Sequence, residues 1–183
     1  MALLAEEIVE EWLNRNGYFT VRGAKVGLYE IDLLAIKKTG SKIVRRHIEV
    51  QASIRPVSYI TPLPKQVQRK TGRAPYNASK RNPKELKRSV KEWVYKKFLM
   101  EEKCRLRESL FPGKWEYELV VNKVRHPEEL SFIEKEGVKI LRLSDIIEEL
   151  SSGSTCIKSA AGRDLVELVM LKTKQSKPTA AGQ

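Results

Sequence analysis

The sequence is poor in the residues that bind structural zinc or build disulfide frameworks. Its 183 residues include only two cysteines, Cys104 and Cys156, and two histidines, His47 and His126. No CxxC or HxxxH pair occurs, so a structural zinc site is not expected. Two cysteines so far apart in the chain are typical of free thiols in a reducing compartment.

Long apolar runs are also missing. None approaches the roughly 20 residues that a helix needs to cross a bilayer. The N-terminus has no basic start and reaches Glu6 and Glu7 at once, which is not typical of a signal peptide. We therefore expect a soluble, cytoplasmic protein with no membrane partner. The length predicts one domain with a short appendage.

Acidic residues are absent between Gln51 and Lys84, in a chain whose formal net charge is +12. This stretch holds eight basic residues, which are Arg55, Lys65, Arg69, Lys70, Arg73, Lys80, Arg81 and Lys84. Such a concentration of positive charge favours binding to the phosphates of a nucleic acid. A solvated basic loop is the alternative interpretation.

Hydrophobic periodicity predicts alternating helices and strands. Helices are expected at residues 3–16, 84–103, 127–135, 144–150 and 163–172. Strands are expected at residues 18–22, 29–38, 42–52, 115–124 and 138–143. Ser144 is the expected N-cap of its helix. This order predicts an α/β fold in which a mixed β-sheet is flanked by helices.

The domain organisation follows from the same pattern. Residues 1–150 are expected to form the main domain, with a basic insertion at about 53–83 that is rich in proline and holds one short helix at 65–69. Residues 151–183 are expected to form a linker, a short helix and a flexible tail. Trp93 and Phe98 lie on one apolar helical stripe and are expected to pack in the core.

Two carboxylates interrupt otherwise apolar strands. Asp32 lies among isoleucine and leucine residues, and Glu49 lies between Ile48 and Val50. If their strands pair as a hairpin, these two carboxylates converge, and they repel each other unless a cation bridges them. Oxygen ligands of this kind suit Mg²⁺ or Mn²⁺. We expect that removing either carboxylate leaves the metal-free protein equally stable or more stable.

The pattern resembles the PD-(D/E)XK (restriction-endonuclease-like) nucleases over about residues 3–143. That superfamily places an acid on its first core helix, an Asp on the second strand and an E-x-K motif on the third, and it cuts phosphodiesters with Mg²⁺. The helix that leads to Gly17-Tyr18 is similar to the opening of archaeal Holliday-junction resolvases. The resemblance implies catalytic roles for Glu6, Asp32, Glu49 and Gln51, and metal binding by Asp32, Glu49 and Val50.

One position departs from the family pattern. Gln51 stands where the motif has lysine. Glutamine can orient an attacking water but brings no positive charge to the transition state. Some similar members supply a lysine from the following helix, for which Lys87 and Lys91 are the candidates here.

The resemblance implies a metal-dependent endonuclease acting on duplex or branched DNA in repair, recombination or restriction. The family often dimerises, so a homodimer stays open. A restriction role would need base-reading side chains in the insertion, for which the candidates are Gln66, Gln68, Arg69 and Arg73. Tyr59 and Tyr76 are candidates for stacking on unpaired bases.

Two further hypotheses belong to other classes. The first is a catalytically inactive nucleic-acid-binding module on the same fold, which the Gln51 substitution favours. The second is an unrelated RNA-binding protein, although no stretch of the chain matches a known RNA-binding motif.

Overall fold

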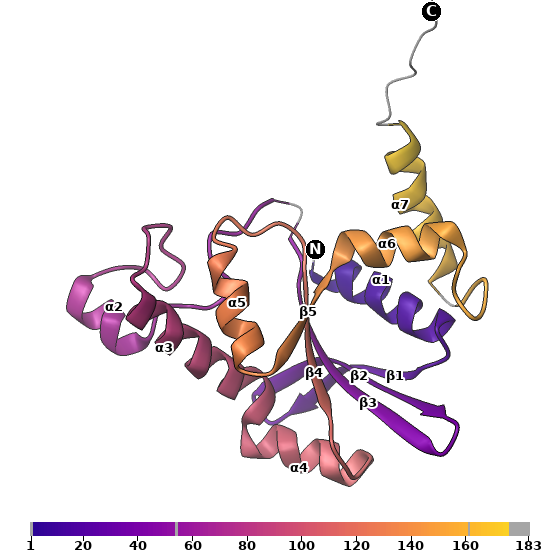
Figure 1. Ribbon diagram of the computed structural model, residues 1–183, viewed down its shortest axis with the longest axis horizontal. Helices are drawn as coiled ribbons and strands as arrows, with labels where there is room; N and C mark the ends of the chain where they lie inside the picture. Colours follow the sequence, from indigo (N-terminus) through magenta and orange to yellow (C-terminus); the bar gives the residue numbers. More distant parts are fainter. Residues whose placement is uncertain (1, 54, 161, 176–183) are drawn as a thin grey trace, which may run out of the picture.

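The computed structural model describes residues 2–53, 55–160 and 162–175 (Figure 1). One five-stranded sheet has the strand order β1-β2-β3-β4-β5. The antiparallel strands are β1 (Phe19–Val26), β2 (Tyr29–Thr39) and β3 (Lys42–Gln51). The parallel additions are β4 (Glu116–Val121) and β5 (Val138–Arg142). Helices flank the sheet on both sides, so the predicted mixed sheet with flanking helices is confirmed.

One face of the sheet is covered by α1 (Ala2–Arg15) and α6 (Leu143–Ser152). Ile8, Val9 and Leu13 of α1 are buried against Leu33 and Ile48 of the sheet. The predicted N-cap of α6 is wrong. The helix begins after Arg142 with no side-chain cap, and the Ser144 hydroxyl instead donates to the Asp145 carboxylate.

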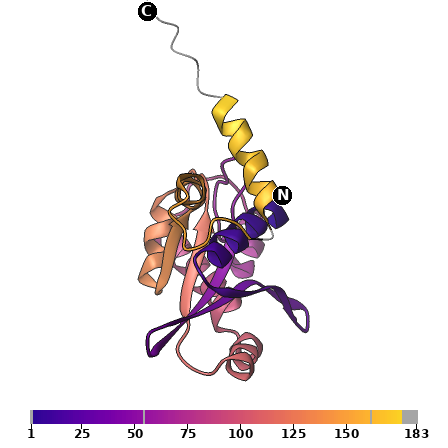
Figure 2. The ribbon, with the colours of Figure 1, turned by 90° about the vertical axis from the view of Figure 1, so that its right-hand side faces the viewer.

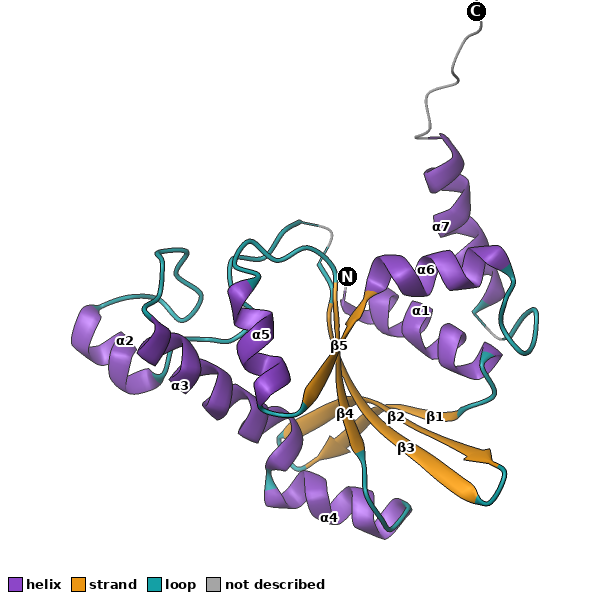
Figure 3. Cartoon of the chain, in the orientation of Figure 1, coloured by secondary structure: helices purple, strands orange, loops and turns teal. Residues whose placement is uncertain are grey.

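The other face is covered by α3 (Pro83–Val94) and α5 (Glu128–Lys135), with α2 (Lys65–Thr71) lying further out (Figure 3). Val90, Trp93 and Phe98 are buried there against Leu119 and Val121 of β4. The core role expected for Trp93 and Phe98 is confirmed.

The single helix predicted at 84–103 is wrong, because the chain turns within it. After α3, a π-helical turn, η1 (Tyr95–Leu99), leads to Met100, whose backbone is extended (φ −57°, ψ 138°). A separate helix, α4 (Glu101–Leu110), then runs beneath the sheet. Neither glycine nor proline marks this break, so no ordinary helix-stop signal predicts it.

The chain beyond α6 is tied back to α1. The amides of Ala160 and Gly162 donate to the buried Glu11 carboxylate at 2.9 and 2.7 Å, and Glu11 also pairs with Arg15. α7 (Arg163–Gln175) follows and buries Val166 before it projects from the body (Figure 2). α6 takes up Ser151 and Ser152 of the expected linker. Residues 176–183 of the expected flexible tail lie outside the described residues.

Candidate active site

Strands β2 and β3 place Asp32 and Glu49 side by side. Leu33 and Ile48 form the paired position furthest from the hairpin turn, and just beyond this pair Asp32 precedes Leu33 on β2 while Glu49 follows Ile48 on β3. The Asp32 carboxylate accepts a hydrogen bond from the Val50 amide at 2.8 Å. Burial, and then the charge of Glu49, raises the pKa of Asp32 to about 6. A proton or a cation would stabilise this carboxylate pair.

Glu6 approaches the pair from α1. Its side chain is buried, and burial followed by the charges of Asp32 and Glu30 raises its pKa. Glu10, one turn further along α1, is not part of the group, because it pairs with Arg22 at 3.0 Å. Three carboxylates from α1, β2 and β3 therefore raise the local negative charge at one end of the sheet.

Two lysine ammonium groups contact Glu49, whose side chain is fully buried. Lys97 of η1 contacts Glu49 Oε2, and Lys103 of α4 lies 3.3 Å from Oε1. Burial lowers the pKa of Lys97, but the carboxylates of Glu49 and Asp32 outweigh this effect, so the net shift is upward.

The two lysines differ in freedom. The Lys103 side chain is 2% exposed, and its ammonium also donates to the carbonyls of Glu30 at 2.7 Å and Lys97 at 3.0 Å. The Lys97 side chain is 26% exposed. Lys103 is therefore fixed in the structure, whereas Lys97 can reach a molecule that enters the site.

His47 connects Glu49 to Arg107 of α4. Arg107 Nη1 lies 2.7 Å from His47 Nδ1, and His47 Nε2 lies 3.1 Å from Glu49 Oε1. Because a guanidinium can only donate, Nδ1 accepts and Nε2 carries the proton that Glu49 receives. Burial, and then the charges of Arg107 and Lys103, hold the pKa of His47 well below its usual range, which keeps the ring neutral.

The lysine candidates from the sequence are wrong. Lys87 and Lys91 are exposed on α3, and neither contacts Glu49. The ammonium groups at the carboxylates belong to Lys97 and Lys103. Gln51 is half-buried two residues after Glu49, at the end of β3.

Two residues of the expected nucleic-acid surface, Arg81 and Arg73, instead bind other groups of the protein. Arg81 is 5% exposed and donates to the carbonyls of Thr61 and Pro75, so its assignment to a phosphate-binding surface is corrected. Arg73 pairs with Glu85. The six that remain exposed are Arg55, Lys65, Arg69, Lys70, Lys80 and Lys84.

Most of the proposed base-reading side chains also have partners within the protein. The Gln66 side-chain oxygen accepts a hydrogen bond from Arg88 at 2.7 Å, and the Gln68 side-chain amide donates to the Leu63 carbonyl. With Arg73 paired to Glu85, only Arg69 of the four candidates is exposed without such a contact among the described residues.

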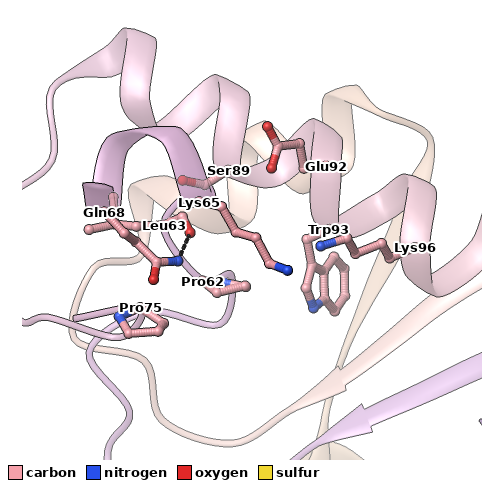
Figure 4. Close-up of a pocket in the computed structure, with 9 residues that line it drawn as sticks. All are labelled: Pro62, Leu63, Lys65, Gln68, Pro75, Ser89, Glu92, Trp93 and Lys96. Carbon is pink, nitrogen blue, oxygen red and sulfur yellow. Dashed lines mark hydrogen bonds between the residues drawn. The ribbon is translucent and has the colours of Figure 1, made fainter. Parts of the chain in front are cut away.

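A cavity of about 230 Å³ lies between α2 and α3. Lys65 of α2 and Lys96 of η1 extend their ammonium groups toward it beside the Trp93 ring (Figure 4). Glu92 also lines the cavity, but its carboxylate pairs with Arg88. Two convergent ammonium groups of this kind suit one phosphate of a polyanion.

Sequence patterns missed three residues around Glu49, which are Lys97, Lys103 and Arg107. A signal existed for Lys97, because it lies three and seven residues after the buried Val94 and Val90. A lysine on an apolar helical stripe has to find a buried partner. No comparable signal existed for Lys103 and Arg107, because they follow the unpredicted break at Met100.

Two carboxylates of the site are of the kind that a hard divalent cation binds. Asp32 and Glu49 lie on neighbouring strands, and burial together with the charge of Glu49 raises the pKa of Asp32, an effect that a bound cation would oppose. Among the described residues, no three His, Cys, Asp or Glu side chains are arranged around one ion position. A site here therefore needs a main-chain oxygen as well, for which the family resemblance indicates Val50.

Comparisons with known proteins leave the function open. No family model matches the chain, and neither does any curated protein. A solved structure described as a protein of unknown function, AF1548, aligns with a TM-score of 0.45 and 18% identity. The alignment covers 79% of this chain and 59% of that one.

Among the described residues, no helix is long and apolar enough to cross a membrane.

The Asp32 pKa predicts a pH-dependent stability. Its folded pKa of about 6 exceeds its ordinary pKa of 3.8, so its contribution to the free energy of unfolding is present below about pH 4 and lost as the pH rises through 6. In EDTA, Asp32→Asn should stabilise the protein at pH 7–8 by on the order of 1–2 kcal/mol, after allowance for partial solvent screening. Urea unfolding at several pH values measures this.

A matched control is Glu134→Gln, which neutralises an exposed carboxylate and should change the free energy of unfolding by about 0.5 kcal/mol or less. Glu49→Gln should destabilise the protein, because the Lys97 and Lys103 ammonium groups lose their anion. The sequence predicts that removing either carboxylate leaves the metal-free protein equally stable or more stable. The structure reverses this prediction for Glu49, and it stays a prediction for Asp32. Equal stability of Asp32→Asn and wild type across the pH range would contradict the carboxylate repulsion.

Proposed function

We propose that the protein is a divalent-metal-dependent endonuclease of the PD-(D/E)XK type that hydrolyses DNA phosphodiesters in repair, recombination or restriction. The observation that carries this proposal is the placement of the Asp32 and Glu49 carboxylates on neighbouring strands beside a partly exposed lysine. Mg²⁺ or Mn²⁺ held by Asp32, Glu49 and the Val50 carbonyl would polarise the phosphodiester and lower the pKa of a bound water.

Lys97 takes the role that the motif lysine has in the family. Its ammonium lies beside the carboxylates and carries the positive charge that Gln51 lacks. It would stabilise negative charge on the phosphate oxygens as the bond breaks. Gln51 would orient the attacking water by a hydrogen bond, and Glu6 would add negative charge to the cation site.

The exposed cations of the insertion support a nucleic-acid partner. Lys65, Arg69 and Lys70 lie on α2, which also borders the cavity between α2 and α3. Because phosphate contacts position a duplex without reading its sequence, this surface favours a DNA-structure-directed enzyme over a restriction enzyme. The hydrogen bonds of the Gln66 and Gln68 side chains within the protein also favour a structure-directed enzyme, because these side chains are then not free to read bases.

One observation favours a second function. Both carboxylate oxygens of Glu49 already contact lysine ammonium groups, and Gln51 replaces the motif lysine. A catalytically inactive nucleic-acid-binding module could use this neutralised carboxylate as a structural element alone. Such a module would bind DNA equally well with and without divalent metal.

Cleavage assays separate these two functions. Plasmid, single strands, flaps and four-way junctions are incubated with Mg²⁺, Mn²⁺ or EDTA. Lys97→Met and Gln51→Ala should each lower kcat by about 10²-fold while DNA and Mn²⁺ binding persist, because both residues act mainly in the transition state. Lys91→Met, at an exposed lysine of α3, is the matched control and should keep wild-type turnover.

Metal titration completes the test. Asp32→Ala and Glu49→Ala should abolish Mn²⁺ binding in isothermal titration, because each removes a charged ligand. Wild-type protein that binds DNA but cleaves none of these substrates with any metal would support the inactive module and contradict the enzyme.

DNA affinity should fall steeply with salt because of the exposed cations on α2. Arg69→Gln with Lys70→Gln should reduce the slope of log affinity against log salt by about 1 to 2, at about 0.9 per phosphate contact. Fluorescence anisotropy at several salt concentrations measures the slope. The control pair, Lys38→Gln with Lys42→Gln, lies on the β2–β3 hairpin at the opposite end of the molecule and should leave the slope unchanged. An equal reduction by both pairs would place the DNA surface elsewhere.

A further inference from the structure

A second pocket, of about 260 Å³, opens beside the candidate active site. Its walls come from the end of β3 and from two parts of the 53–83 insertion, and they are formed by Gln51, Val57, Ser58, Tyr59, Ile60 and Tyr76. Gln51 follows Glu49 by two residues on the same strand, so the pocket adjoins the carboxylates. Tyr76 also lies close enough to Lys97 to contribute to the upward shift of the pKa of Lys97.

One wall of this pocket is held rigidly. The amide of Val57 donates to the Lys123 carbonyl at 3.2 Å, which joins the insertion to the chain after β4. The amides of Ile60 and Thr61 donate to the fully buried Glu129 carboxylate at 2.7 and 2.9 Å. This wall of the pocket therefore has its shape before any ligand enters.

The two tyrosines of the pocket differ in availability. Tyr59 is 3% exposed, and its ring stacks on the His126 ring with centroids 4.2 Å apart. The Arg81 guanidinium lies over the Tyr59 ring, 3.8 Å from its centroid. The expectation that Tyr59 stacks on a base is therefore corrected. Tyr76 is 60% exposed, and among the described residues its ring stacks on no other aromatic ring.

Two further side chains of the pocket are polar, those of Gln51 and Ser58. Within the described part of the chain, neither the Gln51 amide nor the Ser58 hydroxyl makes a hydrogen bond to the protein. An amide offers both a donor and an acceptor, and a hydroxyl can act as either. An aromatic face beside such groups matches the chemistry of a nucleobase, which has a flat face and a polar edge.

We propose that this pocket receives one unpaired nucleobase of the substrate strand, which stacks on Tyr76 with its polar edge toward Ser58. This inference rests on the proposed nuclease function and narrows its substrate class. A base within a duplex is stacked on both faces and paired at its edge, so it cannot enter. The preferred substrates are therefore single strands, overhangs and branch points that expose a base beside the phosphate to be cut.

The test is a binding measurement that needs no cleavage. Fluorescence anisotropy in EDTA compares a labelled single strand, a strand of equal length built from abasic sites, and a duplex. Tyr76→Ala should weaken binding to the base-bearing strand by about tenfold, because one base–aromatic stack is lost. Binding to the abasic strand and the duplex should not change. Tyr76→Phe, which keeps the ring, should bind like wild type.

Phe19→Ala is the matched control, because Phe19 is a 79% exposed aromatic residue on β1, away from the pocket. It should leave all three affinities unchanged. Equal losses for Tyr76→Ala on the base-bearing and abasic strands, or no loss on either, would overturn the base pocket while the nuclease proposal stands. Wild-type protein that binds none of the three probes would overturn both.

Discussion

The buried carboxylate of Glu49 is the constraint on which the surrounding structure depends. A charge without exposure to water is costly unless it is paired and hydrogen-bonded. Glu49 forms ion pairs with Lys97 and Lys103 and accepts a hydrogen bond from His47 Nε2. Since the two lysines come from η1 and α4, pairing this one carboxylate also attaches those elements to the central strands.

The break before α4 lets lysines from two helical segments reach Glu49. A continuous helix would carry its lysines away from the sheet, whereas the turn at Met100 returns α4 beneath it. Lys103 is then fixed by two carbonyls and Glu49, which leaves the more exposed Lys97 to meet a substrate. One carboxylate thus has a fixed cation, Lys103, and a more exposed one, Lys97, which the proposed reaction would use.

The sequence predicted what periodicity controls and missed what long-range pairing controls. The hairpin pattern predicted that Asp32 and Glu49 converge, because that pattern depends on residues near in the chain. The positions of Lys97 and Lys103 depend on a helix break that no glycine or proline marks. The burial of Arg81 depends on the fold of the whole insertion, so its charge alone gave a misleading assignment.

The central claim is that Asp32 and Glu49 form a divalent-cation site whose neighbouring lysine can move. Anomalous diffraction from a crystal soaked in Mn²⁺ tests it most directly. The account predicts a peak bounded by the two carboxylates and the Val50 carbonyl, with the Lys97 ammonium withdrawn from Glu49 while Lys103 stays in place. A saturating soak that yields no peak there, with both lysines still bound to Glu49, would contradict it.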